Sequence, residues 1–556
     1  MLRNLIELGA GCLIIFLPRV SFLKRSPENE PFSDSREKGQ YYRISVSILF
    51  VIFAFLLFYK VGEIPTPWHV DEAGMAYDAL SIAEYGVDRY LYKNPVYFIN
   101  FGGGQNAFYT YLAALCIKLF RYSILSIRLP ALILALTAFA LFVHMIRREY
   151  GETAALIGGG LLCILPFSIM HTRWALESYL LFPMMIISTS IFTETVKSGK
   201  TSLFFLSGLL FGITLYTYAI AYIFLALFLL ISVLYLLILR KVSRKQLLTF
   251  GFPLFLLAFP LLLMLAVNNG YMNEIRTNLF SIPKLLKYRS DSIGWQQILP
   301  NLQFSRENLF YKIFFNDGLM YNAVTKYGTL YCFSIPFILS GFVLSCKKAL
   351  LMIRKNVFSL DFLMTAAFFS TLLTSLLISE PNINRVNMIY FPLIYFLCLG
   401  VFHAGKGGKI PALLTAVIYL ALFTGFFRYY FNDFQKTADD SFYISSITDL
   451  KEALDFAEEV RQNDRRVVVV GKSQPYIYTI LALKTDPYTF DREKTTENLE
   501  VTAFLHYSFL GFLTWDEIPA DYVYIFRDKN TIPENIMNMG FATRDFGSLR
   551  VYYSPK

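Results

Sequence analysis

The chain has 556 residues, of which 55% are hydrophobic and only 17% are charged, and its formal net charge is +10. A water-soluble protein of this length carries far more charge, so the composition excludes a large soluble enzyme. Apolar runs of about 17–22 residues recur along the chain, which is the length that crosses ~30 Å of hydrocarbon. Because these runs are continuous, they predict a polytopic α-helical membrane protein.

The positive charge is concentrated in five short loops, which carry fourteen Lys and Arg but only three acids. These loops are residues 147–152, 194–200, 240–246, 347–355 and 406–409. Such an excess of positive charge in short loops marks the cytoplasmic side of a membrane protein. The net charge therefore reflects topology, so we expect membrane lipids and no nucleic acid as partners.

The N-terminus begins with a short apolar run over residues 5–20, followed by charged residues up to Arg43. No small-residue cleavage site follows this run, which argues against a signal peptide. We predict that residues 1–43 form an interfacial and cytoplasmic segment with an anchor helix. An additional span over residues 5–20 is the alternative.

Eleven runs are predicted to cross the membrane. They lie near residues 44–60, 127–146, 153–170, 176–193, 202–219, 222–239, 247–267, 329–346, 359–379, 387–403 and 411–427. All five basic loops then face the cytoplasm, as does the N-terminus, provided that residues 107–120 do not cross. That run is short and contains Lys118, a costly charge at membrane depth, so it is predicted to be a helix on the outer membrane surface. A short tilted span is the alternative, and it would place the basic loops outside.

Residues 428–556 differ in character from the spans. "ITDLKEALDFAEEVRQN" has helical spacing, and "RRVVVVG" and "DYVYIFRD" are typical of buried strands. The chain is therefore predicted to contain a transmembrane domain over 44–427, with outer loops 61–126 and 268–328, and an extracytoplasmic α/β domain over 428–556. The sequence contains no CxxC motif and no cluster of histidines, so it gives no indication of a zinc site.

An acid pair, Asp71–Glu72, lies shortly after the first span in "PTPWHVDEAGMAYDA". One interpretation is that Asp71 is the N-cap of a helix over 72–85 that ends at Gly86. The other is that Asp71 is a general base, which takes a proton from an attacking hydroxyl. Spacing alone leaves both open, but the cap does not explain why Glu72 and Asp78 lie nearby.

Three arginines lie at predicted outer helix ends, against the positive-inside trend: Arg128, Arg173 and Arg385. Each can extend toward lipid headgroups, and two have an acid close by, Glu177 for Arg173 and Glu380 for Arg385. The alternative is recognition of a phosphate, whose oxygens a guanidinium matches bidentately.

Other outer residues are candidates for substrate contact, among them Asp78 and Glu177. Arg89 and Lys93 are further candidates for a phosphate, and Tyr109 can stack on a sugar ring or belong to the interfacial aromatic belt. The glycines of "FINFGGGQNAFY" are either a hinge or a set of backbone amides for an anion. The spans are nearly free of charge, so we expect the chemistry at the outer membrane interface.

The outer motifs together resemble those of GT-C membrane glycosyltransferases, and in particular bacterial protein O-mannosyltransferases and the aminoarabinose transferases of lipid A. The likeness is carried by "DEAGMAYDALSIAEYGVDRY", "NPVYF", "FGGGQNAFYTYL", "IRLPALI", "HTRWALE", "DGLMYNAVTKYGTLYCFSIPF" and "NRVNMIYFPLIYF". It extends from residue 44 to about 403 and is most specific in the first loop.

The resemblance implies inverting transfer of a sugar from a polyprenyl-phosphate donor to a hydroxyl of a lipid, glycan or protein on the outer face of the plasma membrane. It implies that Asp71 is the base and that Arg173 and Arg385 bind the donor phosphate. Glu72 would orient the acceptor or help to hold a divalent metal ion; no other cofactor is implied. The WWD signature of oligosaccharyltransferases is absent from the sequence, so transfer of a whole glycan to asparagine is not expected.

Two other functions remain as alternatives. A transporter or flippase of a lipid-linked saccharide needs a polar path between the spans, and few charges are there to line one. A non-catalytic membrane scaffold leaves the acids and arginines of the outer loops unexplained. The prediction is therefore a multi-pass glycosyltransferase.

Overall fold

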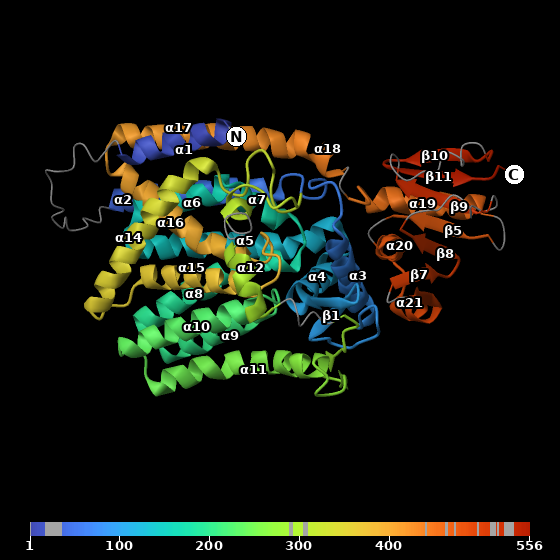
Figure 1. Cartoon of the computed structure of the whole chain (residues 1–556), viewed down its shortest axis with the longest axis horizontal. Coiled ribbons are helices and arrows are strands. Elements are labelled where there is room, and N and C mark those ends of the chain that lie inside the picture. Colours follow the sequence, from blue (N-terminus) through green and yellow to red (C-terminus); the bar gives the residue numbers. More distant parts are fainter. Residues whose placement is uncertain are drawn as a thin grey trace. The chain divides into compact units, whose positions relative to one another are not determined.

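The computed structural model describes residues 2–16, 36–287, 293–303, 310–439, 442–461, 465–471, 474–497, 500–511, 519, 522–527 and 539–555. The chain divides into two compact units. Unit 1 consists of Met1–Tyr59, Ala131–Phe259 and Ser290–Tyr430, and unit 2 of Lys60–Pro130, Pro260–Arg289 and Phe431–Lys556. Figure 1 labels the helices and strands along the chain.

Most of the predicted spans are long apolar helices. In the described part of the chain, nine helical segments are long and apolar enough to cross a membrane. Their main helices are α2 (Arg36–Phe58), α5 (Ile124–Tyr150), α8 (Leu181–Ser198), α10 (Ala221–Ile238), α11 (Arg244–Asn268), α14 (Ile335–Arg354), α15 (Leu360–Leu377), α16 (Tyr390–Gly405) and α17 (Lys409–Arg428). A polytopic helical membrane protein is thus confirmed.

The two remaining predicted spans are less regular. Helices α6 (Glu152–Ile164) and α7 (Pro166–Arg173) meet at an angle of 55° and make a tenth span if they cross together. Pro166 causes the break, because proline cannot continue a helix but starts one well. Helix α9 (Thr201–Leu215) is roughly 22 Å long at 1.5 Å per residue, so its crossing stays a prediction.

The N-terminal helix α1 (Leu2–Phe16) packs within unit 1 against η7 (Cys332–Ser334), α14 and α17. A Cβ added at Gly11 would lie 2.8 Å from the carbonyl oxygen of Phe333, so the backbones approach closely. Arg3 lies over the ring of Tyr327, 4.4 Å from its centre. α1 is therefore packed on the helical bundle, and its position at the membrane interface stays a prediction.

The C-terminal part of unit 2 is a seven-stranded mixed sheet in the order β10-β11-β9-β5-β8-β7-β6. Its strands are β5 (Val467–Val470), β6 (Lys494–Glu497), β7 (Glu500–Phe504), β8 (Tyr507–Leu510), β9 (Val523–Arg527), β10 (Ala542–Phe546) and β11 (Leu549–Tyr553). The central strand β5 runs parallel to β8 and β9. Both predicted strands, now β5 and β9, are confirmed, as is the predicted helix, now α19 (Ile447–Val460).

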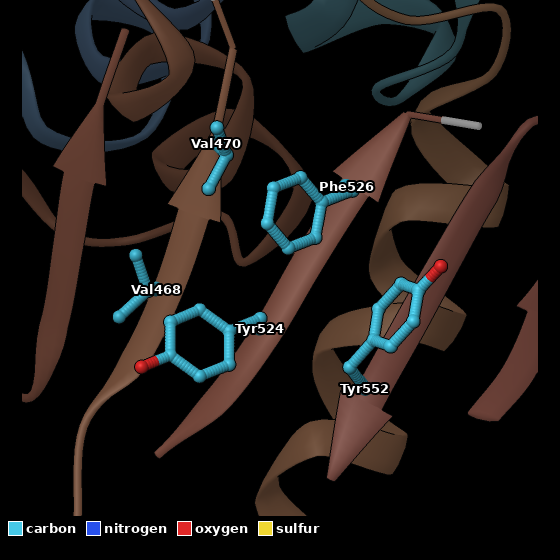
Figure 2. Close-up of a cluster of buried hydrophobic side chains, with 5 residues drawn as sticks. All are labelled: Val468, Val470, Tyr524, Phe526 and Tyr552. Carbon is cyan, nitrogen blue, oxygen red and sulfur yellow. The ribbon is translucent and has the colours of Figure 1, made fainter. Parts of the chain in front are cut away.

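The two faces of this sheet are covered differently. Figure 2 shows side chains of three neighbouring strands on one face, and these form a buried cluster: Val468, Val470, Tyr524, Phe526 and Tyr552. Helix α19 lies on the opposite face, where Phe456 contacts the ring of Tyr553. Because successive strand residues point to opposite faces, the side chains of Tyr552 and Tyr553 lie on opposite faces of the sheet.

The loop 61–126, which is predicted to lie outside, belongs to the same unit. It contains α3 (Val70–Tyr85), the hairpin β1 (Tyr97–Asn100) and β2 (Gly103–Asn106), and α4 (Ala107–Phe120). Helix α3 ends at Gly86 in the left-handed conformation, as the sequence predicts. The α20 helix (Pro475–Ala482) of the C-terminal region packs against α3. The loop and the C-terminal region therefore fold as one unit.

The remaining short elements complete the chain. They are η3 (Glu177–Leu180), β3 (Ile275–Arg276), β4 (Ser281–Ile282), η5 (Trp295–Gln297), α12 (Ile298–Gln303), α13 (Lys312–Phe314), η8 (Asn387–Ile389), η9 (Tyr429–Asp433), α18 (Phe434–Asp439) and α21 (Pro487–Glu493).

Candidate active site

Helix α3 begins at the acid pair, and its N-cap is His69. The His69 backbone is extended, and its Nδ1 accepts a hydrogen bond from the backbone N–H of Asp71 at 3.1 Å. Asp71 and Glu72 therefore lie in the first turn of the helix, where the helix dipole stabilises negative charge. The interpretation of Asp71 as the N-cap is wrong, because the helix starts two residues earlier.

The two acids have opposite environments. The Asp71 side chain is 47% exposed, whereas that of Glu72 is fully buried. Glu72 forms a two-pronged ion pair with Arg128, with Oε1 2.8 Å from Nε and Oε2 3.2 Å from Nη2. Arg128 also donates to the carbonyls of Val61 and Pro65 and has no exposed surface. The structure thus gives Glu72 and Arg128 a supporting role in place of the predicted contacts with a metal ion, acceptor or phosphate.

A second buried ion pair lies further along α3. Asp78 accepts from Arg89 twice, with Oδ1 3.0 Å from Nε and Oδ2 2.7 Å from Nη2. Arg89 also donates to the carbonyl of Gly74 at 2.6 Å, and both side chains are almost fully buried. This pair ties α3 to the loop that follows it, so neither residue offers the substrate contact predicted for it.

Asp71 lies among residues from three segments of unit 2, and Asn100 donates a hydrogen bond to its side chain. Its Oδ1 accepts from Nδ2 of Asn100 at 3.3 Å, and its Oδ2 lies 3.6 Å from Nδ1 of His69. Tyr478 of α20 is buried and donates to the carbonyl of Trp68 at 3.2 Å. Burial and then the charge of Asp71 raise the pKa of Tyr478, so its hydroxyl stays neutral. The result is an oriented carboxylate with one side open.

The glycines of the first loop have a structural role. Phe101 and Gly102 form a two-residue hairpin turn with φ of 49° and 79°, the left-handed conformation that such turns require. A Cβ at Gly104 would clash with the ring of Tyr97. The turn and this close contact account for the glycines without an anion.

Arg173 caps a helix. Its guanidinium donates to the carbonyls of Leu56, Leu57 and Tyr59 at 2.9, 2.8 and 2.7 Å. These are carbonyls at the C-terminal end of α2, which lack partners within their own helix. Arg173 is fully buried, so the structure does not support its predicted contact with a phosphate, while Glu177 is partly exposed at the start of η3.

Arg385 differs from the three buried arginines. It is partly exposed, and its Nη1 donates to the carbonyls of Ser379 and Glu380, the latter at 3.4 Å. Among the described residues, no carboxylate lies within ion-pair distance of Arg385. Lys312 donates nearby to the carbonyl of Pro381 at 3.0 Å. Of the other candidates, Lys93 is exposed and Tyr109 is buried.

An apolar cavity of about 310 Å³ lies in unit 1. Two of its wall residues, Ile313 and Ile389, are close in sequence to Lys312 and Arg385. The rest of the wall comes mainly from α14, α15 and α16, including Ile338, Phe342, Phe368, Leu393 and Phe396. The sequence showed these residues only as parts of three apolar spans, so the cavity was not predicted.

The motifs "DGLMYN" and "NRVN" hold loops together. Asp317 accepts from Nδ2 of Asn322 at 2.6 Å and from the backbone N–H of Ile383 at 3.0 Å. Asn387 donates to the carbonyl of Ser178 at 2.5 Å, and Tyr179 donates to Oδ1 of Asn322 at 3.0 Å. This network fixes the backbone around Arg385.

The described residues contain no group of three or more His, Cys, Asp or Glu side chains that could hold a metal ion. Both oxygens of Glu72, the predicted metal ligand, are engaged by Arg128.

Comparisons with known proteins agree with this architecture. Residues 107–266 match the family model of dolichyl-phosphate-mannose-protein mannosyltransferases. The structure of ArnT from Cupriavidus metallidurans in the apo state is similar at 12% identity and a TM-score of 0.53, covering 94% of this chain and 100% of that one. The same protein bound to undecaprenyl phosphate has 12% identity and a TM-score of 0.50, covering 93% and 99%. No curated protein matches the chain.

At this identity the likeness to ArnT shows the fold. The fold and the family model together support a GT-C membrane glycosyltransferase, which confirms the resemblance seen in the outer motifs.

Proposed function

We propose that this protein transfers a sugar from a polyprenyl-phosphate donor to an acceptor hydroxyl, with inversion at the anomeric carbon. The observation that carries the proposal is Asp71, a half-exposed carboxylate that accepts a hydrogen bond from Asn100 while the next acid is buried in an ion pair. A general base needs this combination of fixed orientation and access.

In the proposed step, the oxygen of the acceptor hydroxyl attacks the anomeric carbon of the donor. A new carbon–oxygen bond forms to the acceptor, and the bond from the anomeric carbon to the phosphate oxygen breaks. The hydroxyl proton passes to Asp71, and the bonding electrons leave with the polyprenyl phosphate. The released phosphate carries one more negative charge than the donor, so positive groups stabilise it.

Arg385 and the apolar cavity are the proposed elements for the donor in unit 1. A partly exposed guanidinium without a carboxylate partner among the described residues keeps its charge for a phosphate. The cavity walls are apolar, which suits part of a polyprenyl chain. The ArnT structure with undecaprenyl phosphate supports a lipid phosphate of this kind.

We propose that transfer occurs on the outer face of the plasma membrane, because the basic loops assign the opposite side to the cytoplasm. Single cysteines at positions 243 and 382, in a cysteine-free background, test this in intact cells. Only the cysteine at 382 should react with an impermeant thiol reagent. Labelling at 243 would reverse the topology.

The reaction is tested with purified protein in lipid vesicles and undecaprenyl phosphate carrying radiolabelled mannose or aminoarabinose. We expect label to leave the lipid and free undecaprenyl phosphate to appear when an extract of cell-envelope acceptors is added. Movement of intact labelled lipid between leaflets without cleavage would favour a flippase instead. The same assay with a chelator tests whether a metal ion is required. Because Glu72 is engaged by Arg128, we expect the rate of transfer to be unchanged.

A further inference from the structure

We infer that Asn100 is a positioning residue for this reaction, which holds the carboxylate of Asp71 in one orientation. The inference rests on the proposed role of Asp71 as the base. Asn100 ends strand β1, is 8% exposed, and donates from Nδ2 to Oδ1 of Asp71 at 3.3 Å.

The Asn100 side chain is itself fixed against helix α3. A Cβ added at Gly74 would lie 2.7 Å from Oδ1 of Asn100 and 3.0 Å from Nη2 of Arg89. Gly74 is three residues after Asp71, so the two share one side of the helix. The amide therefore rests on the bare backbone of α3 at a position that only glycine leaves open.

The orientation of the amide follows from the carboxylate. An ionised carboxylate only accepts hydrogen bonds, so the amide must present Nδ2 to Asp71. Its buried Oδ1 then finds no hydrogen-bond partner among the described residues. A buried oxygen without a hydrogen-bond partner is unfavourable. The Asn100 amide nevertheless keeps Nδ2 on Asp71, so we assign this hydrogen bond a role in the site.

The charged and titratable groups around Asp71 come from every neighbouring segment. His69 precedes it, the ion pairs Glu72–Arg128 and Asp78–Arg89 lie on α3 and its flanking loops, and Tyr478 faces it from α20. Among the described residues, the side chain of Asn100 hydrogen-bonds to Asp71 and to none of these groups. An effect of a change at Asn100 on transfer can therefore be assigned to Asp71 once His69 is controlled.

The first test compares Asn100→Ala with wild type. We expect kcat to fall about ten- to a hundredfold, the worth of a hydrogen bond to a charged group, while KM for the lipid donor is unchanged. The same comparison in a His69→Asn background, where asparagine keeps the helix cap, separates the effect of Asn100 from that of His69.

A second variant reaches the same contact from the other side. Gly74→Ala should displace the Asn100 amide and lower kcat similarly, and the double variant should be no worse than either single one. Gly160→Ala in α6 is the matched control, because a Cβ there meets no atom within 4 Å. Melting curves verify that each variant is folded.

A readout that needs no transfer keeps the two proposals separate. Carbodiimide modifies carboxyl groups, and modification of Asp71 at a fixed pH can be followed by peptide mass spectrometry. Asn100→Ala should speed this modification, because the carboxylate loses its hydrogen-bond partner; an unchanged rate together with a wild-type kcat would overturn the role of Asn100. Normal transfer by Asp71→Asn would instead overturn the proposed function.

Discussion

The N-terminal half of α3 and the segment around Arg385 use charge in opposite ways. Along α3, Glu72 and Asp78 are each matched by an arginine in a buried two-pronged pair, and only Asp71 is left half-exposed. The guanidinium of Arg385 donates to backbone carbonyls, whose dipoles fix its position but do not neutralise its charge. A buried charge needs a partner, and Asp71 and Arg385 are the charges that keep solvent access, which is why the proposed function uses them.

The same comparison sorts the arginines. All three at predicted outer helix ends violate the positive-inside trend, yet Arg128 completes an ion pair, Arg173 caps a helix and Arg385 alone is partly exposed. Two of these three unexpected arginines are therefore structural supports. The contact partner decides between the two.

Removal of the Asp71 base should have the largest effect. Asp71→Asn keeps the size of the side chain but removes proton acceptance, so we expect transfer to fall by ~10²–10⁴-fold with an unchanged melting curve. Asp455→Asn, on the exposed face of α19, is the matched control and should transfer normally. If Asp71→Asn transferred sugar at the wild-type rate, Asp71 would not be the base and would no longer differ from Glu72 in its role.

Breaking the Glu72–Arg128 pair should mainly affect stability. Glu72→Gln leaves a buried guanidinium without its counter-charge, which costs about 3–5 kcal/mol in the free energy of unfolding. Chemical denaturation of the purified protein in detergent measures this. The double variant Glu72→Gln with Arg128→Met should recover much of the loss. A stable Glu72→Gln protein that has lost transfer would instead return Glu72 to the chemistry.

Arg385→Lys should weaken binding of undecaprenyl phosphate about tenfold, because lysine keeps the charge but loses the planar fork. Thermal stabilisation by added undecaprenyl phosphate, titrated with each variant, gives the affinity. Arg492→Lys on the exposed α21 serves as control. Equal affinities of all three proteins would place the phosphate elsewhere, with the exposed Lys93 as the next candidate.

The smallest expected effect concerns Asp88 and the pH dependence of the free energy of unfolding. Burial raises the pKa of Asp88 to about 7, and the charge of Asp78 adds to it, while backbone N–H groups of Tyr92 and Tyr90 oppose the rise. The unfolded chain loses this proton near pH 4. Wild-type stability should therefore fall as pH rises from about 4 to 7 and then level off.

Asp88→Asn keeps the oxygen that accepts from Tyr90 and Tyr92 but does not ionise. Its melting temperature should match that of wild type below pH 4 and exceed it increasingly up to pH 7. Parallel curves for the two proteins across this range would contradict the assignment.

Helices and strands followed from local patterns, whereas the roles of single polar residues did not. The apolar runs, the hydrophobic periodicity of α19 and the glycine that ends α3 are all signals within a few residues of the structure they determine. The division of labour between Asp71 and Glu72 depends on Arg128, which lies 56 residues away. No local pattern carries that information.

Asn100 shows the same limit from the other side. Its sequence context is a hairpin before a glycine turn, which is typical of asparagine for purely conformational reasons. Its contact with Asp71 spans 29 residues and depends on a bare glycine in α3. The acid pair drew attention to α3, but the contact of Asp71 with Asn100 became visible only in three dimensions.

The packing of α20 on α3 has a consequence for biogenesis. Trp68 lies three residues before Asp71, and its carbonyl accepts a hydrogen bond from the hydroxyl of Tyr478, which is 410 residues further along the chain. Tyr77 of α3 likewise donates to the carbonyl of Thr485. At 5–20 residues per second, ribosomes need roughly 20–80 s to make that stretch. Throughout this interval α3 lacks the helix that packs against it. A nascent chain halted before residue 475 would carry Asp71 and Asn100 and yet lack the contacts that α20 makes with α3 and with Trp68.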